Sequence, residues 1–448
     1  MKRFFAIVAV LTILLTCFSL SADAVTFNVD FETAADSLYL VNLDTDTVVF
    51  DKNGHNKMFP ASTTKIMTYI VTVENVGDLK NTKVLVDSDI LSLLDGTGSS
   101  LSGLQNFSGE YVTVYDLLEC LMIKSGNDAA LLLANHVGGS IQDFVDMMNA
   151  KAEEIGCKNT HFMNPHGLHD ENHYTTAEDL VTMARYAQTL PEFSEISSKV
   201  TAYLSIDKEQ EYPLVTTNYM IDDTRGGSYY YEYAKGIKTG TTDEAGYCLV
   251  STASKDGYTY MCVALGAPSV TSTGEEIEEN GAMLTSKAMY EWAFNTLENK
   301  SVITEDTIVC EVPVELAWEQ DTVHLVPQVG YSAILPNNIE GSSIDMVTDV
   351  PKSLTAPIIE GTVIGTVTIS YANQELTTVN LIAEETIERS KLLYFLDRAK
   401  MIIHSKWMIV SILVVIVLIV IYTIITVIYN SKKKKRKKRK KVQQKKSI

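Results

Sequence analysis

The chain has 448 residues, with 37 Lys or Arg against 56 Asp or Glu, and a formal net charge of −19. Twelve of the basic residues lie at or after Lys432, so the preceding part carries about −31, which argues against nucleic acid as its ligand. The six scattered cysteines exclude a disulfide framework and a Cys-x-x-Cys metal or redox motif. One pairing, between Cys248 and Cys262, stays open.

The first 24 residues have the organisation of a secretory signal peptide. Lys2 and Arg3 form a positive segment, residues 4–20 are apolar, and Ala22-Asp23-Ala24 is a small-x-small cleavage site. We therefore predict an exported mature chain that begins near Val25. An uncleaved N-terminal anchor is the alternative.

Residues 25–300 are predicted to form one α+β domain. The opening run SLYLVNLDTDTVVFD is typical of a β-hairpin. A mainly helical stretch follows, with helices predicted to begin at Thr113, Ser140 and Thr175, each three residues before an acidic residue. The later runs GYCLVSTAS and YTYMCVALGA are strand-like and are joined by a hairpin turn at residues 255–257, before a final amphipathic helix. This order favours an antiparallel sheet with a helical cluster.

The remaining sequence predicts a second domain and a membrane anchor. Residues 303–383 hold short strand-like runs and are predicted to form a small β-rich sandwich. Residues 384–406 are typical of an amphipathic juxtamembrane helix, and the uncharged segment 407–429 is long enough to cross a bilayer.

The tail at residues 430–448 sets the predicted topology. Its basic run, Lys432–Lys441, is costly to translocate and so is expected in the cytoplasm, with the large domains outside a single-pass cell-membrane anchor. Attraction to anionic lipid headgroups is favoured over nucleic-acid binding as a further role for this run, because it abuts a membrane helix and has no interleaved aromatic residues.

A Ser-x-x-Lys pattern, Ser62 to Lys65, begins an apolar run with helical spacing. Residues three apart share a helix face, so the Lys65 amine can lie beside the Ser62 hydroxyl. A lysine whose pKa is lowered by burial and by a neighbouring cation can act as a base. On this stretch alone, a serine N-cap with a surface lysine is the more favoured interpretation. The tail's Ser431-x-x-Lys434 has no apolar helix face behind it and serves as a control.

Two further short motifs share the first domain. Ser125-Gly126-Asn127 lies between two predicted helices, where Gly126 allows a break and Asn127 could also cap the second helix. Lys238-Thr239-Gly240 lies in a strand-like run, where a glycine permits close approach of another backbone or a ligand. An edge-strand lysine beside a bulge glycine is the structural alternative. Each motif is weak alone, and their order and settings make the set specific.

These three motifs resemble the active-site set of serine penicillin-binding proteins and β-lactamases. The surrounding runs PASTTKIMT, SGNDAALLLA, THFMNPHGLHDENHYTTAEDL and GIKTGTTDEAGYCL are similar to the low-molecular-mass D-alanyl-D-alanine carboxypeptidases, a peptidase S11-like family of serine enzymes. The resemblance covers nearly the whole exterior chain, including the β-rich second domain and the anchor. It implies the serine DD-peptidase fold and no cofactor or metal.

The resemblance also implies catalytic roles. Ser62 would attack the carbonyl between two D-alanines of a peptidoglycan stem and form an acyl-enzyme, and Lys65 would take its proton. Ser125 would relay a proton to the departing D-alanine, with Lys238 supplying positive charge. β-Lactams would acylate the same serine as covalent inhibitors.

Substrate binding is implied for the neighbouring residues. Asn127 would hold the peptide amide, and Thr239 and Thr241, together with Lys238 and Gly240, would bind the terminal part of the substrate. The backbone N–H groups of the nucleophilic serine and of Thr241 would form the oxyanion hole, whose donors are each worth roughly 3–4 kcal/mol in the barrier.

The sequence departs from the family at one point. Members often place an arginine shortly after the strand that here ends in ALGA, where it reads the substrate carboxylate, yet no Lys or Arg occurs between Lys255 and Lys287. Recognition would then rest on Lys238, Thr239 and Thr241, or on a basic residue elsewhere. DD-endopeptidase or transpeptidase activity becomes the alternative function.

Four rival classes fit the sequence less well. A β-lactamase needs a deacylating glutamate, and Glu171 lacks the expected Glu-x-x-Leu-Asn setting. A non-catalytic β-lactam sensor would need a signalling domain, and the tail has only basic residues. A structural wall-binding protein would leave the three motifs without a function. A zinc carboxypeptidase would use a histidine-rich loop that Gly and Pro break. Its candidate ligands are His161, His166, His169, His173 and Asp170.

Overall fold

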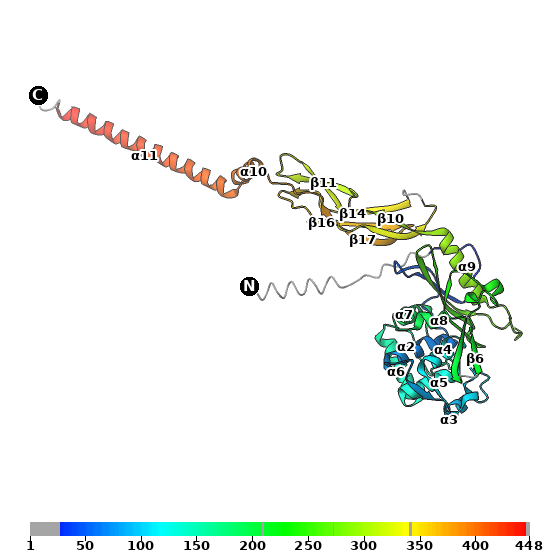
Figure 1. Ribbon diagram of the computed structural model, residues 1–448. Helices are drawn as coiled ribbons and strands as arrows, with labels where there is room; N and C mark the ends of the chain where they lie inside the picture. Colours follow the sequence, from blue (N-terminus) through cyan, green and yellow to red (C-terminus); the bar gives the residue numbers. More distant parts are fainter. Residues whose placement is uncertain (1–26, 208–209, 272, 340–342, 445–448) are drawn as a thin grey trace. The chain divides into compact units, whose positions relative to one another are not determined.

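The computed structural model describes residues 27–207, 210–271, 273–339 and 343–444. The predicted signal peptide, residues 1–24, lies outside this part of the chain. The described chain separates into two compact units, the first built mainly from residues up to Val302 and the second mainly from residues after it (Figure 1).

A five-stranded antiparallel sheet forms the centre of the first unit, with strand order β2-β1-β9-β8-β7. The predicted hairpin turn between β8 and β9 is confirmed, because Lys255 pairs with Tyr258 across Asp256 and Gly257, whose φ angles are 52° and 86°. The strand β7, which carries the Lys238 motif, is an edge strand of this sheet. The strands are β1 (Ser37–Asn42), β2 (Thr47–Lys52), β7 (Ala234–Thr242), β8 (Gly246–Lys255) and β9 (Tyr258–Ala267).

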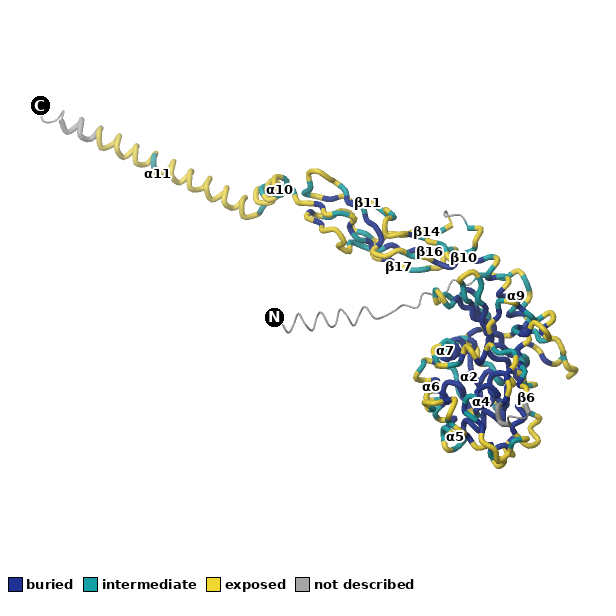
Figure 2. Tube along the Cα trace, in the orientation of Figure 1, coloured by how far each residue is buried: buried dark blue, intermediate teal, exposed yellow. Residues whose placement is uncertain are grey.

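Helices cover both faces of this sheet, which confirms the predicted α+β class. On one face Ile237, Val250 and Val263 join the core of the helical cluster, and on the other Leu249 and Ala264 pack with α9. Figure 2 shows this buried interior. The longer helices are α2 (Lys65–Asn75), α4 (Val114–Met122), α5 (Asn127–Gly138), α6 (Ile141–Glu154), α7 (Ala177–Gln188) and α9 (Gly281–Thr296). Shorter elements are α3 (Ser88–Leu91), α8 (Phe193–Ser197), β3 (Lys83–Leu85), β4 (Tyr111–Thr113), β5 (Thr201–Asp207) and β6 (Gln210–Val215).

The cysteine pairing that the sequence left open is not formed. The five described cysteines are free. Cys248 belongs to the core on the helical-cluster face, whereas Cys262 belongs to the core on the α9 face. Two side chains that point to opposite faces of a sheet cannot form a disulfide without movement of the backbone.

Two of the three predicted helix starts are confirmed, and one is shifted by a residue. Thr113 and Ser140 are N-caps that accept the backbone N–H of the acidic residue three positions later. The third prediction was wrong, because Thr176 caps α7, accepting from the backbone of Asp179. Thr175 pairs through its backbone with Met58 instead, in an isolated β-bridge that keeps it outside the helix.

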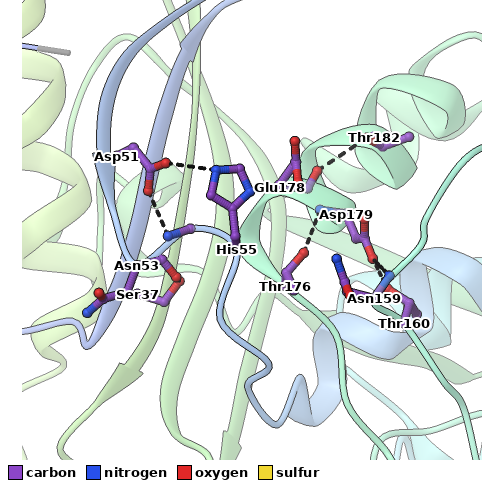
Figure 3. A network of polar contacts seen from close by, with 11 residues as sticks. Ser37, Asp51, Asn53, His55, Asn159, Thr160, Thr176, Glu178, Asp179 and Thr182 are labelled. Atoms are coloured by element: carbon purple, nitrogen blue, oxygen red, sulfur yellow. Dashed lines mark hydrogen bonds and ion pairs between the residues drawn. The ribbon is translucent and has the colours of Figure 1, made fainter. Parts of the chain in front are cut away.

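A polar network ties the end of β2 to the start of α7 (Figure 3). His55 Nε2 lies 3.1 Å from Asp51 Oδ2, and its Nδ1 lies 2.8 Å from Glu178 Oε2. The hydrogen bond to Glu178 is the main cause that raises the pKa of His55. The next residue, Asp179, accepts a hydrogen bond of 2.7 Å from Thr160 Oγ1. The first turn of α7 is thereby held by residues from two other segments.

The later part of the chain is β-rich, as predicted. A six-stranded sheet has the order β14-β16-β17-β12-β11-β15, and β10 pairs with β13. The strands are β10 (Leu297–Ile303), β11 (Cys310–Glu315), β12 (Thr322–Pro327), β13 (Tyr331–Pro336), β14 (Ile344–Asp349), β15 (Leu354–Thr355), β16 (Val363–Tyr371) and β17 (Gln374–Ala383).

Two helices follow the strands. The first, α10 (Lys391–Ile403), exposes large apolar side chains such as Phe395 and Ile402. The second, α11 (Lys406–Gln444), contains the segment Lys406–Lys437, the one stretch among the described residues that is long and apolar enough to cross a membrane.

Candidate active site

Ser62 lies in the short helical segment that leads into α2. It belongs to a 3-10 helix, Ala61–Thr64, and its side chain caps neither this helix nor α2, so the N-cap interpretation is wrong. The preceding Ala61 has a φ of 47°. A residue with a Cβ in this left-handed region costs roughly 1–2 kcal/mol. The backbone is therefore held in an unfavourable conformation directly before the candidate nucleophile.

Two glycines from different parts of the chain lie against the backbone of Ala61 and Ser62. A Cβ on Gly240 of β7 would lie 2.9 Å from the backbone nitrogen of Ser62. A Cβ on Gly167, whose φ is 90°, would overlap the carbonyl oxygen of Ala61. Both positions therefore need glycine so that two backbones can approach the serine closely. The sequence predicted this for Gly240 and gave no indication of it for Gly167.

Lys65 is completely buried and points its amine at the serine. Its Nζ lies 2.8 Å from Ser62 Oγ, and its N–H groups donate to Asn127 Oδ1 at 2.6 Å and to the carbonyl oxygen of His166 at 2.7 Å. Burial, and then the positive charge of Lys238, hold the pKa of Lys65 well below its usual value. A neutral amine can accept a proton, so this environment suits a base beside a hydroxyl nucleophile.

Lys238 supplies a second buried amine from strand β7. Its side chain is 1% exposed, its Nζ donates to the carbonyl oxygen of Thr239 at 2.9 Å, and burial lowers its pKa to about 7. The hydroxyl of Thr239 lies 2.5 Å from that of Thr217. Thr241, two residues along the strand, is exposed. Strand β7 therefore presents hydroxyl groups next to a buried positive charge.

The Ser125 motif forms the turn between α4 and α5. Ser125 has a φ of 62° and is 5% exposed, and its hydroxyl makes no hydrogen bond to another described residue. Asn127 begins α5 with its side-chain oxygen occupied by Lys65, which leaves its amide N–H groups available as donors. The structure thus brings Asn127 to Lys65, whereas the Ser125 hydroxyl forms no hydrogen bond with Ser62 or Lys65.

A buried carboxylate, that of Asp128, holds this turn in place. It accepts hydrogen bonds from the hydroxyl of Ser102 at 2.7 Å and from the backbone N–H groups of Ser102, Gly103 and Leu104 at 2.9–3.2 Å. A carboxylate at a helix N-terminus is also favoured by the helix dipole. The loop before α4 and the turn after it are thereby fixed to one another.

The histidine-rich loop packs against α2 and does not gather metal ligands. Burial lowers the pKa of His166 to about 3 and that of His173 to about 4. His173 Nδ1 accepts from the backbone of Met163, so its Nε2 donates to Thr64 Oγ1. Both of its nitrogens are therefore engaged. No group of three or more His, Cys, Asp or Glu side chains within the described ranges could hold a metal ion.

A basic residue from another segment, Arg225, lies near the Lys238 motif. Its Nη2 donates to the carbonyl oxygen of Thr216 at 3.0 Å, one residue before the threonine that contacts Thr239. Its Nε also donates to the buried carboxylate of Asp222 at 2.6 Å. That ion pair fixes the guanidinium and compensates much of its charge.

Sequence reasoning missed several residues that shape the site. Gly167 lies against Ala61, Thr217 contacts Thr239, and Asp128, the residue after Asn127, binds the loop at Ser102. An acidic residue at the start of a predicted helix was a usable signal for Asp128, because such residues are favoured there. The other two depend on loops that approach the site only in the folded chain, and no local pattern marks them.

Comparison with known proteins places the chain in a family. A family model for D-alanyl-D-alanine carboxypeptidase, peptidase S11, matches residues 23–269, and one for the C-terminal domain of penicillin-binding protein 5 matches residues 297–389. The chain is 30% identical over 368 residues to D-alanyl-D-alanine carboxypeptidase DacF of Bacillus subtilis, covering 81% of this chain and 88% of the relative. The chain therefore belongs to the D-alanyl-D-alanine carboxypeptidase family of serine peptidases.

Solved structures agree with this assignment. Penicillin-binding protein 5 from Haemophilus influenzae superposes with a TM-score of 0.58 at 25% identity, over 81% of this chain and 100% of that one. The DD-transpeptidase of Streptomyces K15 superposes with a TM-score of 0.52 at 27% identity, over 60% of this chain and 100% of that one. The predicted serine DD-peptidase fold is confirmed.

Proposed function

We propose that this chain removes the terminal D-alanine from peptidoglycan stem peptides through an acyl-enzyme on Ser62. The observation that carries the proposal is the buried Lys65 amine, 2.8 Å from the serine hydroxyl and with a lowered pKa. Acyl transfer at neutral pH requires a nucleophile beside a base, and a lysine can act as that base only when its amine is neutral.

In the first step Lys65 Nζ takes the Ser62 proton while Ser62 Oγ bonds to the carbonyl carbon of the penultimate D-alanine. The resulting oxyanion is placed between the backbone N–H groups of Ser62 and Thr241. When the C–N bond breaks, the leaving nitrogen receives a proton from the Ser125 hydroxyl, which regains one from the protonated amine of Lys65. D-Alanine departs and an ester on Ser62 remains.

In the second step water replaces the departed amine. Lys65 accepts a proton from the water, the hydroxide bonds to the ester carbonyl carbon, and the Ser62 oxygen leaves and takes that proton back from Lys65. Asn127 is positioned to donate from its amide nitrogen to the substrate's peptide carbonyl, since its oxygen is held by Lys65. The ammonium of Lys238 and the hydroxyls of Thr239 and Thr241 are proposed to bind the terminal carboxylate, with Gly240 leaving room for the serine backbone.

The direct test measures D-alanine released from a peptide ending in Lys-D-Ala-D-Ala. Release by the full chain in detergent that persists with added chelator and disappears in Ser62→Ala supports the proposal. Lys65→Met should also abolish release, whereas Lys124→Met, which removes an exposed lysine, is the matched control. Release that continues in Ser62→Ala would refute the serine mechanism, and loss with chelator would revive the zinc alternative.

A DD-endopeptidase or transpeptidase of the same family is the second candidate. The lack of any Lys or Arg between Lys255 and Lys287 favours it, because a reader of the free carboxylate is missing from that segment. If Arg225 takes that role, Arg225→Gln should raise KM for the carboxylate-terminated peptide with little change in kcat. Acylation by benzylpenicillin without D-alanine release would favour the second candidate.

We also propose that the chain is a single-pass cell-membrane protein with its catalytic domain outside. The candidate span in α11 and the basic residues after it support this orientation, as does the signal-peptide pattern at residues 1–24. Proteolysis of intact protoplasts should remove the catalytic domain and spare the tail. Protection of the domain would contradict the orientation. The predicted boundaries at 25–300, 303–383, 384–406, 407–429 and 430–448 stay predictions.

A further inference from the structure

The hydroxyl of Thr217 contacts the hydroxyl of Thr239, next to the buried amine of Lys238. The two Oγ1 atoms lie 2.5 Å apart, at the short end of the range for hydrogen bonds between hydroxyl groups. Thr239 is on β7, whereas Thr217 comes from the segment that follows β6. We propose that Thr217 is a positioning residue, which donates its proton to Thr239 and thereby leaves the Thr239 proton free for the terminal carboxylate of the substrate. The inference rests on the proposed function, because it concerns how the same carboxylate is bound.

The backbone around Thr217 is held by two other segments of the first unit. Its own N–H donates to the carbonyl oxygen of Ile123 at 3.2 Å, at the C-terminal end of α4. The carbonyl oxygen of the preceding residue, Thr216, accepts from Arg225 Nη2 at 3.0 Å. Because these bonds come from separate parts of the chain, the Thr217 hydroxyl is presented to Thr239 from a fixed backbone.

The direction of the hydrogen bond between the two hydroxyls follows from the chemistry of a carboxylate. A hydroxyl carries one proton and two acceptor sites, and a carboxylate accepts hydrogen bonds but cannot donate one. A Thr239 hydroxyl that donated to Thr217 would therefore have no proton for the substrate. Among the residues that the structure describes, neither hydroxyl makes any other hydrogen bond. With the carboxylate bound, Thr239 donates to it and accepts from Thr217, so that both protons are used.

The neighbouring Thr241 shows what this contact adds. Residues two apart on a strand share a face, and the pairing of β7 with β8 is regular from Thr239 to Thr241. Thr241 is exposed, and its hydroxyl forms no hydrogen bond with another residue in the described part of the chain. Ordering a free side chain on binding costs conformational entropy. Of the two hydroxyls proposed to bind the carboxylate, that of Thr239 is therefore the one that is oriented in advance.

Thr217→Val tests the inference, because valine keeps the shape of threonine and removes its hydroxyl. The full chain in detergent is assayed with two acyl donors. One is diacetyl-L-Lys-D-Ala-D-Ala, which ends in the carboxylate, and the other is the phenyl thioester of diacetyl-L-Lys-D-Ala, whose leaving group has none. We expect KM for the peptide to rise about fivefold with little change in kcat, as for the loss of one hydrogen bond that is made equally in the ground state and the transition state. The kcat/KM for the thioester should not change, whereas a general loss of packing would lower it.

Two further variants and one control check that the lost hydroxyl is the cause. Thr217→Ser restores a hydroxyl at the same place and should return KM for the peptide to within about twofold of the wild-type value. Thr217→Ala should give the same result as valine. Thr259→Val is the matched control, because Thr259 also shares a hydrogen bond with another hydroxyl, that of Ser254 at 3.1 Å in the β8–β9 hairpin. It should leave the kinetics with both acyl donors unchanged.

A double-mutant cycle shows whether Thr217 acts through Thr239. Thr239→Val removes the hydroxyl that is proposed to contact the carboxylate. Adding Thr217→Val to this variant should then have no further effect on KM for the peptide, since residues that act as one unit are not additive. Effects that multiply would show that Thr217 acts by another route and would overturn the inference.

The outcomes separate this inference from the proposed function. An unchanged KM for the peptide in Thr217→Val, or equal losses with both acyl donors, would overturn the inference while D-alanine release by the wild-type chain still supports the proposed function. A wild-type chain that turns over the thioester but releases no D-alanine from the peptide would refute the carboxypeptidase proposal, and the inference with it.

Discussion

Replacing Lys238 by methionine should abolish activity and yet make the fold more stable. Burial lowers the pKa of this lysine from 10.5 to about 7. Because each tenfold change in a protonation equilibrium is worth about 1.36 kcal/mol, a protonated Lys238 reduces the free energy of unfolding by about 5 kcal/mol relative to its neutral form. Methionine removes this charge and nearly preserves the length of the side chain.

The sign of the effect fixes its pH dependence. Below pH 7 the lysine is protonated in both the folded and the unfolded chain, so the whole penalty is present. Between pH 7 and 10.5 only the unfolded chain holds the proton, and stability therefore rises with pH. Above 10.5 both states are neutral and the penalty vanishes. The advantage of Lys238→Met should accordingly fall by about 3 kcal/mol between pH 6 and pH 9.

Chemical denaturation of the full chain in detergent, followed by circular dichroism at both pH values, measures this difference. The matched control is Lys235→Met, which removes an exposed lysine from the same strand and should show no such trend. Differences in packing between lysine and methionine do not depend on pH, so they cancel in the comparison. A stability difference between wild type and Lys238→Met that is constant from pH 6 to pH 9 would refute the reasoning.

Three further predictions concern the same site. Gly167→Ala should destabilise the chain by about 3 kcal/mol or more and prevent acylation by benzylpenicillin, because its Cβ would overlap Ala61. Gly109→Ala, at a similar φ of 89° but in open space, should cost only about 1 kcal/mol in thermal unfolding, and equal losses would contradict the packing argument. Asp128→Ala should lower the free energy of unfolding by about 3 kcal/mol and slow acylation by benzylpenicillin, since it leaves buried N–H donors unpaired. No change in either unfolding or acylation would contradict the structural role of this carboxylate. For D-alanine release, kcat/KM should decline above about pH 7 as Lys238 loses its proton, and a profile flat to pH 9 would show that its charge is not used.

Much of the local structure could be predicted because it depends on short-range interactions. The caps at Thr113 and Ser140 and the turn at Asp256-Gly257 are set by hydrogen bonds and backbone preferences within four residues. The cap of α7 was misplaced by one residue, because a β-bridge between Thr175 and Met58 competes with the local signal. Adjacent threonines offer the same local chemistry, and only the distant partner distinguishes them.

The sequence by itself determined the family, the three motifs and the spacing that lets Lys65 face Ser62. It could not determine whether that lysine is buried, and therefore whether it is charged. Three distant segments decide this, supplying Asn127, the His166 carbonyl and the charge of Lys238 around one amine. A motif fixes which groups are present, whereas desolvation and the field of neighbouring charges fix their protonation, and both arise only when separate parts of the chain pack together.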